Sequence, residues 1–194
     1  MMGRYLMLTA VLLACSQTAS AAPGNADAAK AKLSMCIGCH GIPGYRTSYP
    51  EVYSVPKLGG QHTEYIVRAL QAYKDGERSH PSMQGIAGSL PEQDMADIAA
   101  YYSAGATPAG AATQVNDKAQ VCAACHGADG NSPTPDFPRI GGQHEDYLYQ
   151  ALQDYKAGRR KNPIMAAQVE SLSKQDMQAL AAWFAAQRGL FVKR

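Results

Sequence analysis

Two short segments of the chain concentrate thiol and imidazole side chains. CIGCH occupies residues 36–40 and CAACH occupies residues 122–126. Each segment contains two cysteines and a histidine: Cys36, Cys39 and His40 in the first, and Cys122, Cys125 and His126 in the second. Three kinds of chemistry use such a set: a zinc site, a thiol–disulfide switch, or a haem attached through two thioethers with the histidine on its iron.

The first two kinds of chemistry fit the surrounding sequence poorly. A structural zinc site needs four ligands, which each half lacks unless His62 or His144 contributes. A redox-active Cys-x-x-Cys pair usually follows a strand in a thioredoxin-like βαβ unit, and no strand-rich segment precedes either motif. Two plain disulfides would leave the adjacent histidines without a role.

The spacing of the segments suits a haem. If the first cysteine opens a helical turn, the residues three and four positions later share its face, so both thiols and the imidazole point toward one ligand. Cys-x-x-Cys-His is the attachment signal for c-type haem. We therefore predict two covalently bound haem c groups, with His40 and His126 as axial ligands of the two irons.

A methionine at a matched downstream position is expected opposite each histidine, as in class I c-type cytochromes. Met95 and Met177 lie at helical spacing among apolar residues, which is typical of core packing. Met83 and Met165 lie in SHPSMQG and KNPIMAA, polar segments with a proline that we expect to be loops. We predict that Met83 and Met165 are the sixth ligands.

A matched histidine pair, His62 and His144, offers the competing possibility of two bis-histidine haems. Both residues follow Gly-Gly-Gln at the expected start of a helix, where a polar side chain can cap free backbone N–H groups. We interpret them as caps or as contacts to haem propionates. His80 has Asn162 at its counterpart and so cannot be a shared ligand.

An internal repeat divides the chain into two domains. LGGQHTEY at 58–65 matches IGGQHEDY at 140–147, and this offset of 82 continues through the methionine segments. The Cys-x-x-Cys-His motifs are offset by 86, so the first half carries four extra residues before Pro56. We predict domains at 22–104 and 115–194, joined by a linker of small residues, GATPAGAATQ, at 105–114.

The apolar pattern in each half is helical. Residues 65–73 place one apolar face on a helix that should end before Gly76, and a second helix is expected from Pro91 to Tyr102. Ser173 and Asp176 form a candidate capping pair in the second half. The expected fold is all-α: two tandem domains, each of short helices and loops around one covalent haem that supplements a small core. The resemblance described below implies that both are class I cytochrome c domains.

The N-terminus resembles a secretory signal peptide over residues 1–21. Arg4 precedes an apolar run at 5–14, and Ala-Ser-Ala at 19–21 offers a cleavage site. A lipid anchor at Cys15 is the alternative, because Leu-Leu-Ala-Cys resembles a lipobox. No later segment is long and apolar enough to span a bilayer, so we expect an exported protein with no transmembrane helix in its mature form.

The mature chain resembles the cytochrome c4 family, dihaem periplasmic electron carriers built of two class I domains, over essentially all of its length. The second half follows the family pattern closely, whereas GIPGYRTSYPEVYSVP at 41–56 departs from it. The resemblance implies that the carbonyls of Pro56 and Pro138 accept hydrogen bonds from the ring N–H groups of His40 and His126.

Two filled axial positions leave one-electron exchange as the expected chemistry, so we predict an electron carrier and not an enzyme. The expected partners are a redox protein donor and acceptor, namely membrane respiratory complexes ending in a terminal oxidase. The alternatives are a dihaem subunit of a dehydrogenase, such as a sulfide-oxidising flavocytochrome, and a dihaem peroxidase. No nucleic-acid motif is present, and a monomer is expected.

Charge separates the halves. From residue 22 on, the first half carries a net charge of −1 and the second a net charge of +2. Arg159, Arg160 and Lys161 form a basic cluster near Met165, either a solvated helix end or a contact for an acidic partner or the haem propionates. Because positive charge favours the reduced haem, we predict the higher potential for the second haem.

Overall fold

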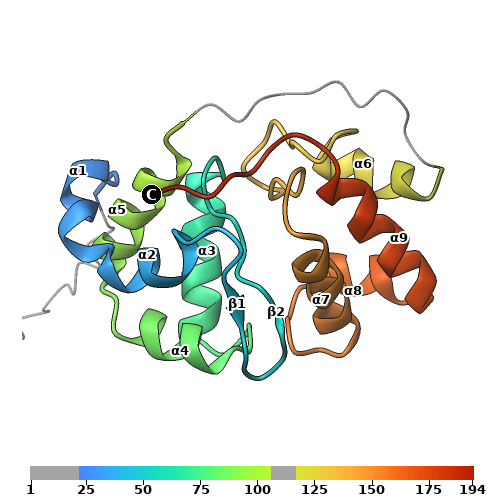
Figure 1. Cartoon of the computed structure of the whole chain (residues 1–194), viewed down its shortest axis with the longest axis horizontal. Coiled ribbons are helices and arrows are strands. Elements are labelled where there is room, and N and C mark those ends of the chain that lie inside the picture. The colour runs from blue at the N-terminus through green and yellow to red at the C-terminus, as the bar shows by residue number, and fades with distance from the viewer. Residues whose placement is uncertain (1–21, 106–116) are drawn as a thin grey trace, which may run out of the picture.

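The computed structural model describes residues 22–105 and 117–194, and these residues form two helical groups that lie side by side (Figure 1). The signal segment and all but the first residue of the expected linker lie outside the described residues. The first group contains α1 (Ala26–Ala29), η1 (Lys30–Lys32), α2 (Ser34–His40), β1 (Arg46–Thr47), β2 (Tyr53–Ser54), α3 (Thr63–Lys74), α4 (Pro81–Gly88) and α5 (Glu92–Ser103). The second contains η2 (Asp117–Ala119), α6 (Gln120–His126), α7 (Glu145–Lys156), α8 (Pro163–Val169) and α9 (Lys174–Ala185).

The two longest helices of each group pack against one another, α3 on α5 and α7 on α9, because each has an apolar stripe at helical spacing. These four helices confirm the helical pattern expected from the sequence. The predicted capping box of Ser173 and Asp176 is also present at the start of α9. Met95 and Met177 are buried, with exposures of 0% and 6%, which confirms their role in packing.

The segments that carry Met83 and Met165 are short helices, and the expectation of loops was wrong. α4 and α8 each begin with a proline, whose fixed φ suits the first helical position. His80 and Asn162 precede these prolines, and their side chains accept hydrogen bonds from the backbone N–H groups of the two methionines, at 3.3 and 3.0 Å. Each methionine is thereby fixed in the first turn of its helix.

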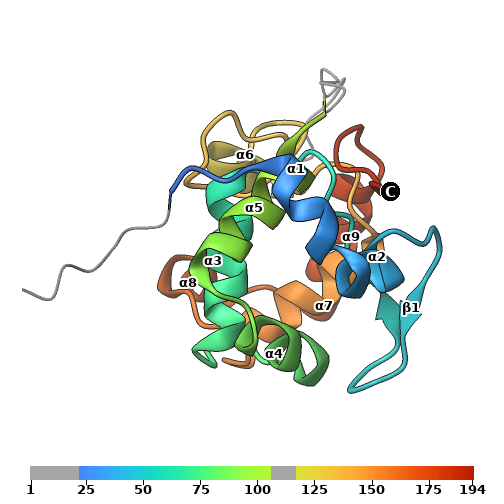
Figure 2. The same cartoon turned by 90° about the vertical axis from the view of Figure 1, so that its left-hand side faces the viewer.

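The four extra residues of the first half belong to a small hairpin that the sequence analysis did not predict. β1 and β2 pair antiparallel, with Arg46 opposite Ser54 and Thr47 opposite Tyr53. Figure 2 shows the hairpin projecting beside the helices, and β2 contacts α7 of the second group. The loop after α2 therefore reaches across to the other domain.

The chain after α9 crosses back to the first domain, where the C-terminus lies near α5 (Figure 1). Gly59 and Phe191 form an antiparallel bridge, with N–O distances of 3.0 and 3.1 Å between their backbones. The hydroxyl group of Tyr101 donates to the carbonyl of Arg194 at 2.7 Å. In the described part of the chain, no helix has the length and apolar character needed to cross a membrane.

Candidate haem sites

Each Cys-x-x-Cys-His segment forms a short helix that ends at its histidine, α2 at His40 and α6 at His126. The four cysteines are partly exposed free thiols, so none is used in a disulfide: Cys36, Cys39, Cys122 and Cys125. Across residues 22–105 and 117–194, no three His, Cys, Asp or Glu side chains gather as a metal site. The helical geometry places the thiols and the imidazole of each segment on one face.

The two histidine rings make the same hydrogen bond. Nδ1 of His40 lies 2.8 Å from the carbonyl oxygen of Pro56, and Nδ1 of His126 lies 2.8 Å from that of Pro138. Burial lowers the pKa of each histidine, although the proline bond acts in the opposite direction. At neutral pH the rings are therefore neutral, with Nδ1–H donating to the proline and Nε2 left with a lone pair that can bind iron.

His62 and His144 occupy the N-cap positions of α3 and α7. The expectation that their side chains cap these helices was wrong, because neither side chain bonds a backbone N–H of its helix. Gln61 and Gln143 accept the backbone N–H groups of these histidines instead, each at 3.0 Å. Nε2 of His62 bonds the carbonyl of Ser132 in the other domain, at 2.9 Å. At each helix start, the side chain that accepts a backbone N–H is therefore the glutamine before the predicted cap.

Equivalent residues of the two domains bond each other across the interface. Arg78 donates to the hydroxyl of Tyr147 at 2.5 Å, and Arg160, its counterpart, donates to that of Tyr65 at 2.6 Å. The backbones of Arg78 and Arg160 pair as an isolated antiparallel bridge. Each guanidinium group also lies over a tyrosine ring of its own domain, Tyr73 or Tyr155 respectively. The contact is therefore close to two-fold symmetric.

These two arginines lack a carboxylate partner within the described residues, where neither Arg78 nor Arg160 takes part in an ion pair. Arg78 is only 9% exposed, and a buried cation without a counter-ion is costly. Burial is the main cause of the lowered pKa of His40 and of His126, and the positive charge of Arg78 and of Arg160, respectively, adds to it. Two anionic haem propionates per domain fit this need.

The basic cluster predicted at residues 159–161 does not form one surface patch. Arg160 turns toward the domain interface, while Arg159 is exposed and pairs with Asp154 at 2.7 Å. Sequence reasoning missed Arg78, the equivalent of Arg160, because a single arginine between polar residues has no pattern of its own. The available signal was its position in the repeat, 82 residues before Arg160.

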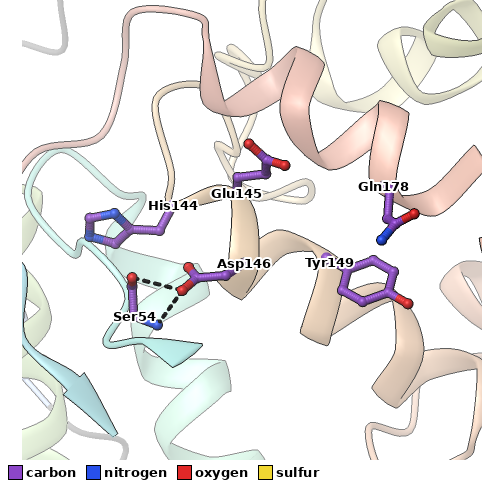
Figure 3. Close-up of a pocket in the computed structure, with 6 residues that line it drawn as sticks. All are labelled: Ser54, His144, Glu145, Asp146, Tyr149 and Gln178. Carbon is purple, nitrogen blue, oxygen red and sulfur yellow. Dashed lines mark hydrogen bonds between the residues drawn. The ribbon is translucent and has the colours of Figure 1, made fainter. Parts of the chain in front are cut away.

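The hairpin binds the start of α7 through one carboxylate. The backbone N–H and the hydroxyl of Ser54 both donate to Asp146, each at 2.9 Å (Figure 3). Arg46 lies 3.4 Å from the same carboxylate. An open pocket of about 420 Å³ lies beside this contact, lined by Ser54, His144, Glu145, Asp146, Tyr149 and Gln178. The contact ties the loop after the first histidine to the second domain.

Comparison with known proteins finds the same duplication. The family model described as Cytochrome c matches residues 26–103 and 112–187. Cytochrome c4 of Pseudomonas aeruginosa is 32% identical over 91% of this chain and 96% of that protein. The crystal structure of reduced recombinant cytochrome c4 from Pseudomonas stutzeri superposes with a TM-score of 0.69 at 29% identity, over 85% of this chain and all of that one. A thiosulfate dehydrogenase electron acceptor of Stutzerimonas stutzeri is 29% identical over 77% of each chain.

Proposed function

Because this chain belongs to the cytochrome c family, with two family domains in tandem as in cytochrome c4, we propose that it carries single electrons through the periplasm from a respiratory donor to a terminal oxidase. The family relationship makes it a dihaem electron-transfer cytochrome with one covalent haem c in each domain. One observation supports the proposal above others: both attachment helices end in a histidine whose ring is tied to a proline carbonyl.

We infer that the first haem is held by thioethers to Cys36 and Cys39, and the second by thioethers to Cys122 and Cys125. The proposed iron ligands are His40 with Met83 and His126 with Met165. Support comes from the Nδ1 bonds of the two histidines, which leave Nε2 for iron, and from the matched first-turn positions of the methionines. A haem iron between imidazole and thioether supplies reversible one-electron exchange at a raised potential.

The remaining contribution of the chain is to hold this ligand set still and to shield it from water. The attachment helices and the proline bonds orient the imidazoles, and α4 and α8 hold the thioethers in helical turns. Arg78 and Arg160 offer cationic partners for propionates between the domains. If His40 with Met83 and His126 with Met165 bind the two irons, these side chains would leave no open position for a substrate, which favours a carrier over a peroxidase.

The periplasmic location is part of the proposal and rests on the N-terminal sequence. Residues 1–21 have the charged start, apolar run and small-residue cleavage site of an export signal. We propose mature domains at 22–104 and 115–194 with residues 105–114 as their linker. Covalent haem attachment in an exported chain is consistent with free cysteines that form no disulfide in the described residues.

A second candidate is a dedicated electron acceptor for a sulfur-oxidising dehydrogenase. The relative named a thiosulfate dehydrogenase electron acceptor favours this candidate, since it aligns with both domains at 29% identity. It would use the same ligands and the same chemistry, and only the donor would differ. The two candidates are therefore separated by partners and not by the haem sites.

The test uses the purified holoprotein, membranes of the source organism, and any dehydrogenase that co-purifies with the protein. We expect the reduced protein to be oxidised rapidly by membranes that contain a terminal oxidase, in a reaction that cyanide stops at the oxidase. We expect no stable complex with a dehydrogenase during purification. Rapid reduction by a co-purifying dehydrogenase on addition of thiosulfate, without oxidation by membranes, would support the second candidate and overturn the first.

A further inference from the structure

We propose that each domain orients the iron-binding histidine of the other domain, through one buried glutamine that crosses the interface. Gln143 of the second domain acts on His40, and Gln61 of the first domain acts on His126. The inference rests on the proposed ligation of iron by these two histidines. It assigns a positioning role to two glutamines whose hydrogen-bond partners in the described residues include neither a cysteine nor a proposed ligand.

The first half of the argument concerns the residue after Pro56. The side-chain amide of Gln143 bonds both backbone groups of Lys57: its Oε1 accepts from the N–H at 2.9 Å, and its Nε2 donates to the carbonyl at 2.9 Å. The N–H of Lys57 and the carbonyl of Pro56 belong to one planar peptide group. Gln143 therefore holds the same rigid plane whose oxygen accepts from His40 at 2.8 Å.

The second domain repeats the arrangement with the roles exchanged. Oε1 of Gln61 accepts from the N–H of Arg139 at 3.0 Å, and its Nε2 donates to the carbonyl of Arg139 at 2.8 Å. The peptide group that joins Pro138 to Arg139 carries the oxygen that accepts from His126 at 2.8 Å. Gln61 and Gln143 are equivalent residues of the repeat, so the crossing is reciprocal.

Burial makes these bonds strong constraints on orientation. Both glutamines are only 5% exposed, and each amide is bonded at its oxygen and at its nitrogen. Losing such a partner would leave a partly buried backbone N–H, that of Lys57 or of Arg139, without this acceptor. In addition, an acceptor on the N–H side of a peptide group polarises the carbonyl on the other side, because hydrogen bonds in a chain strengthen one another.

The expected consequence is a change in how strongly each imidazole donates to iron. A stronger bond from Nδ1–H to the proline carbonyl makes the ring a better donor through Nε2, which favours the oxidised state. Removing the glutamine should weaken that bond and raise the potential of the haem in the opposite domain. The effect must cross the interface, whereas a purely local disturbance would appear in the domain of the glutamine itself.

The experiment compares Gln143→Leu and Gln61→Leu in the full-length holoprotein. Hydrogen exchange of each histidine Nδ1–H is followed by NMR in the reduced, ¹⁵N-histidine-labelled protein, and the two midpoint potentials are measured spectroelectrochemically. The variant Met83→His should lower the midpoint potential of the first haem, and this shift assigns each of the two measured potentials to its haem. We expect Gln143→Leu to speed exchange at His40 and raise the first potential, and Gln61→Leu to do the same at His126 and the second haem.

Two further variants control this comparison. Gln143→Glu keeps an acceptor for the N–H of Lys57 but loses the donor to its carbonyl, so exchange at His40 should lie between that of the wild type and that of Gln143→Leu. Arg68→Ala removes a different interdomain bond, from Arg68 to the carbonyl of Pro135, and should leave exchange at both histidines unchanged. If Gln143→Leu does not retain haem, Gln143→Met carries the same expectation, because its side chain has about the length of glutamine but no amide to bond Lys57.

The pattern of the response decides the outcome. No change at His40 in Gln143→Leu, a change only at His126, or equal changes at both histidines would overturn the proposal. An error in the ligand assignment is recognised separately, because the wild-type spectrum would then lack the signature of histidine and methionine on each iron before any glutamine is changed.

Discussion

The two domains support the same histidine–proline bond with loops of different construction. Sixteen positions separate His40 from Pro56, and twelve separate His126 from Pro138. The longer loop forms the β1–β2 hairpin and is bound by Asp146 of the other domain. The shorter loop closes on itself at Gly130, whose φ of 76° and close approach to the backbone of Gly141 exclude a side chain. The histidine–proline hydrogen bond has the same length, 2.8 Å, in both domains. The domains differ in the loop that holds the proline in place.

The helices that close the two domains also differ in their anchoring. In the first, Asp97 of α5 binds the backbone of Asn25 and the side chain of Lys32 near the start of the described chain. Asp97 has Ala179 as its counterpart, so the second domain cannot repeat this tie. There, the capping box of Ser173 and Asp176 fixes the start of α9. Both domains thus have the same histidine–proline hydrogen bond, while the contacts that anchor α5 and α9 differ.

Removal of haem should have the largest effect, because neither domain is then expected to fold stably. The described core contains ten buried apolar residues in the first domain and a smaller cluster of five in the second, and cores of this size rarely suffice alone. We expect protein made without haem attachment to show no cooperative thermal transition in either domain by circular dichroism. A sharp transition in haem-free protein would show that the polypeptide core is sufficient.

Loss of one methionine should alter one domain and spare the other. Met83→Ala and Met165→Ala should each keep haem attached but open one iron, so that added cyanide or carbon monoxide changes the spectrum of about half of the haem. The matched controls are Met95→Ala and Met177→Ala, which remove buried side chains and should cost about 2–5 kcal/mol of stability without opening an iron. Ligand binding in these controls instead would mean that the axial assignment is wrong.

The sequence was sufficient where a pattern extends over several turns or repeats. Helices such as α3 and α5 have three turns of apolar periodicity, and the internal repeat indicated two domains, which the two matches of the family model confirm. The sequence does not predict the helix of Met83, because eight residues give little periodicity and proline is common in loops as well as at the first position of a helix. The roles of Gln61 and Gln143 were missed because their partners lie about 80 residues away, and no local pattern predicts a contact between domains.

Asp97→Asn should destabilise the first domain selectively. The backbone N–H of Asn25, followed by Lys32 and Gln93, lowers the pKa of Asp97 to about 2, below the value of 3.8 expected for the unfolded chain. The carboxylate therefore stabilises the fold above about pH 4, and this contribution disappears as the pH falls toward 2. We expect a loss of roughly 1–3 kcal/mol at pH 7, which shrinks on acidification.

Thermal unfolding of the holoprotein at several pH values checks this expectation. Asp176→Asn serves as the comparison in the second domain, although Asp176 is the counterpart of Asp94 and not of Asp97. The pKa of Asp176 is likewise lowered to about 2, first by Lys118 and then by Ser173. Each variant should lower the unfolding temperature of its own domain, as reported by the haem absorbance of that domain. A loss at pH 7 that persists undiminished near pH 2 would contradict the electrostatic origin.

The smallest expected effect is the difference in potential between the haems. Arg78 and Arg160 are matched, so the remaining charge differences just before the methionine helices are Glu77 against Arg159 and Ser79 against Lys161. Because the reduced haem carries one positive charge fewer, we expect the second haem to have the higher potential. Glu77→Arg should raise the first potential by on the order of 20 mV per unit charge at about 10 Å in water. If Met83→His lowers the higher wave, the order is reversed.

The C-terminal segment determines how the molecule can be presented to a surface. Since Phe191 pairs with Gly59 and the terminal Arg194 lies beside Tyr101, a group fused after the last residue leaves from the first domain and not from the second. A C-terminal tag used to immobilise the protein on an electrode would therefore bring the first haem domain toward the metal. An anchor introduced on α9 would present the opposite domain, so the place of attachment selects which haem exchanges electrons first.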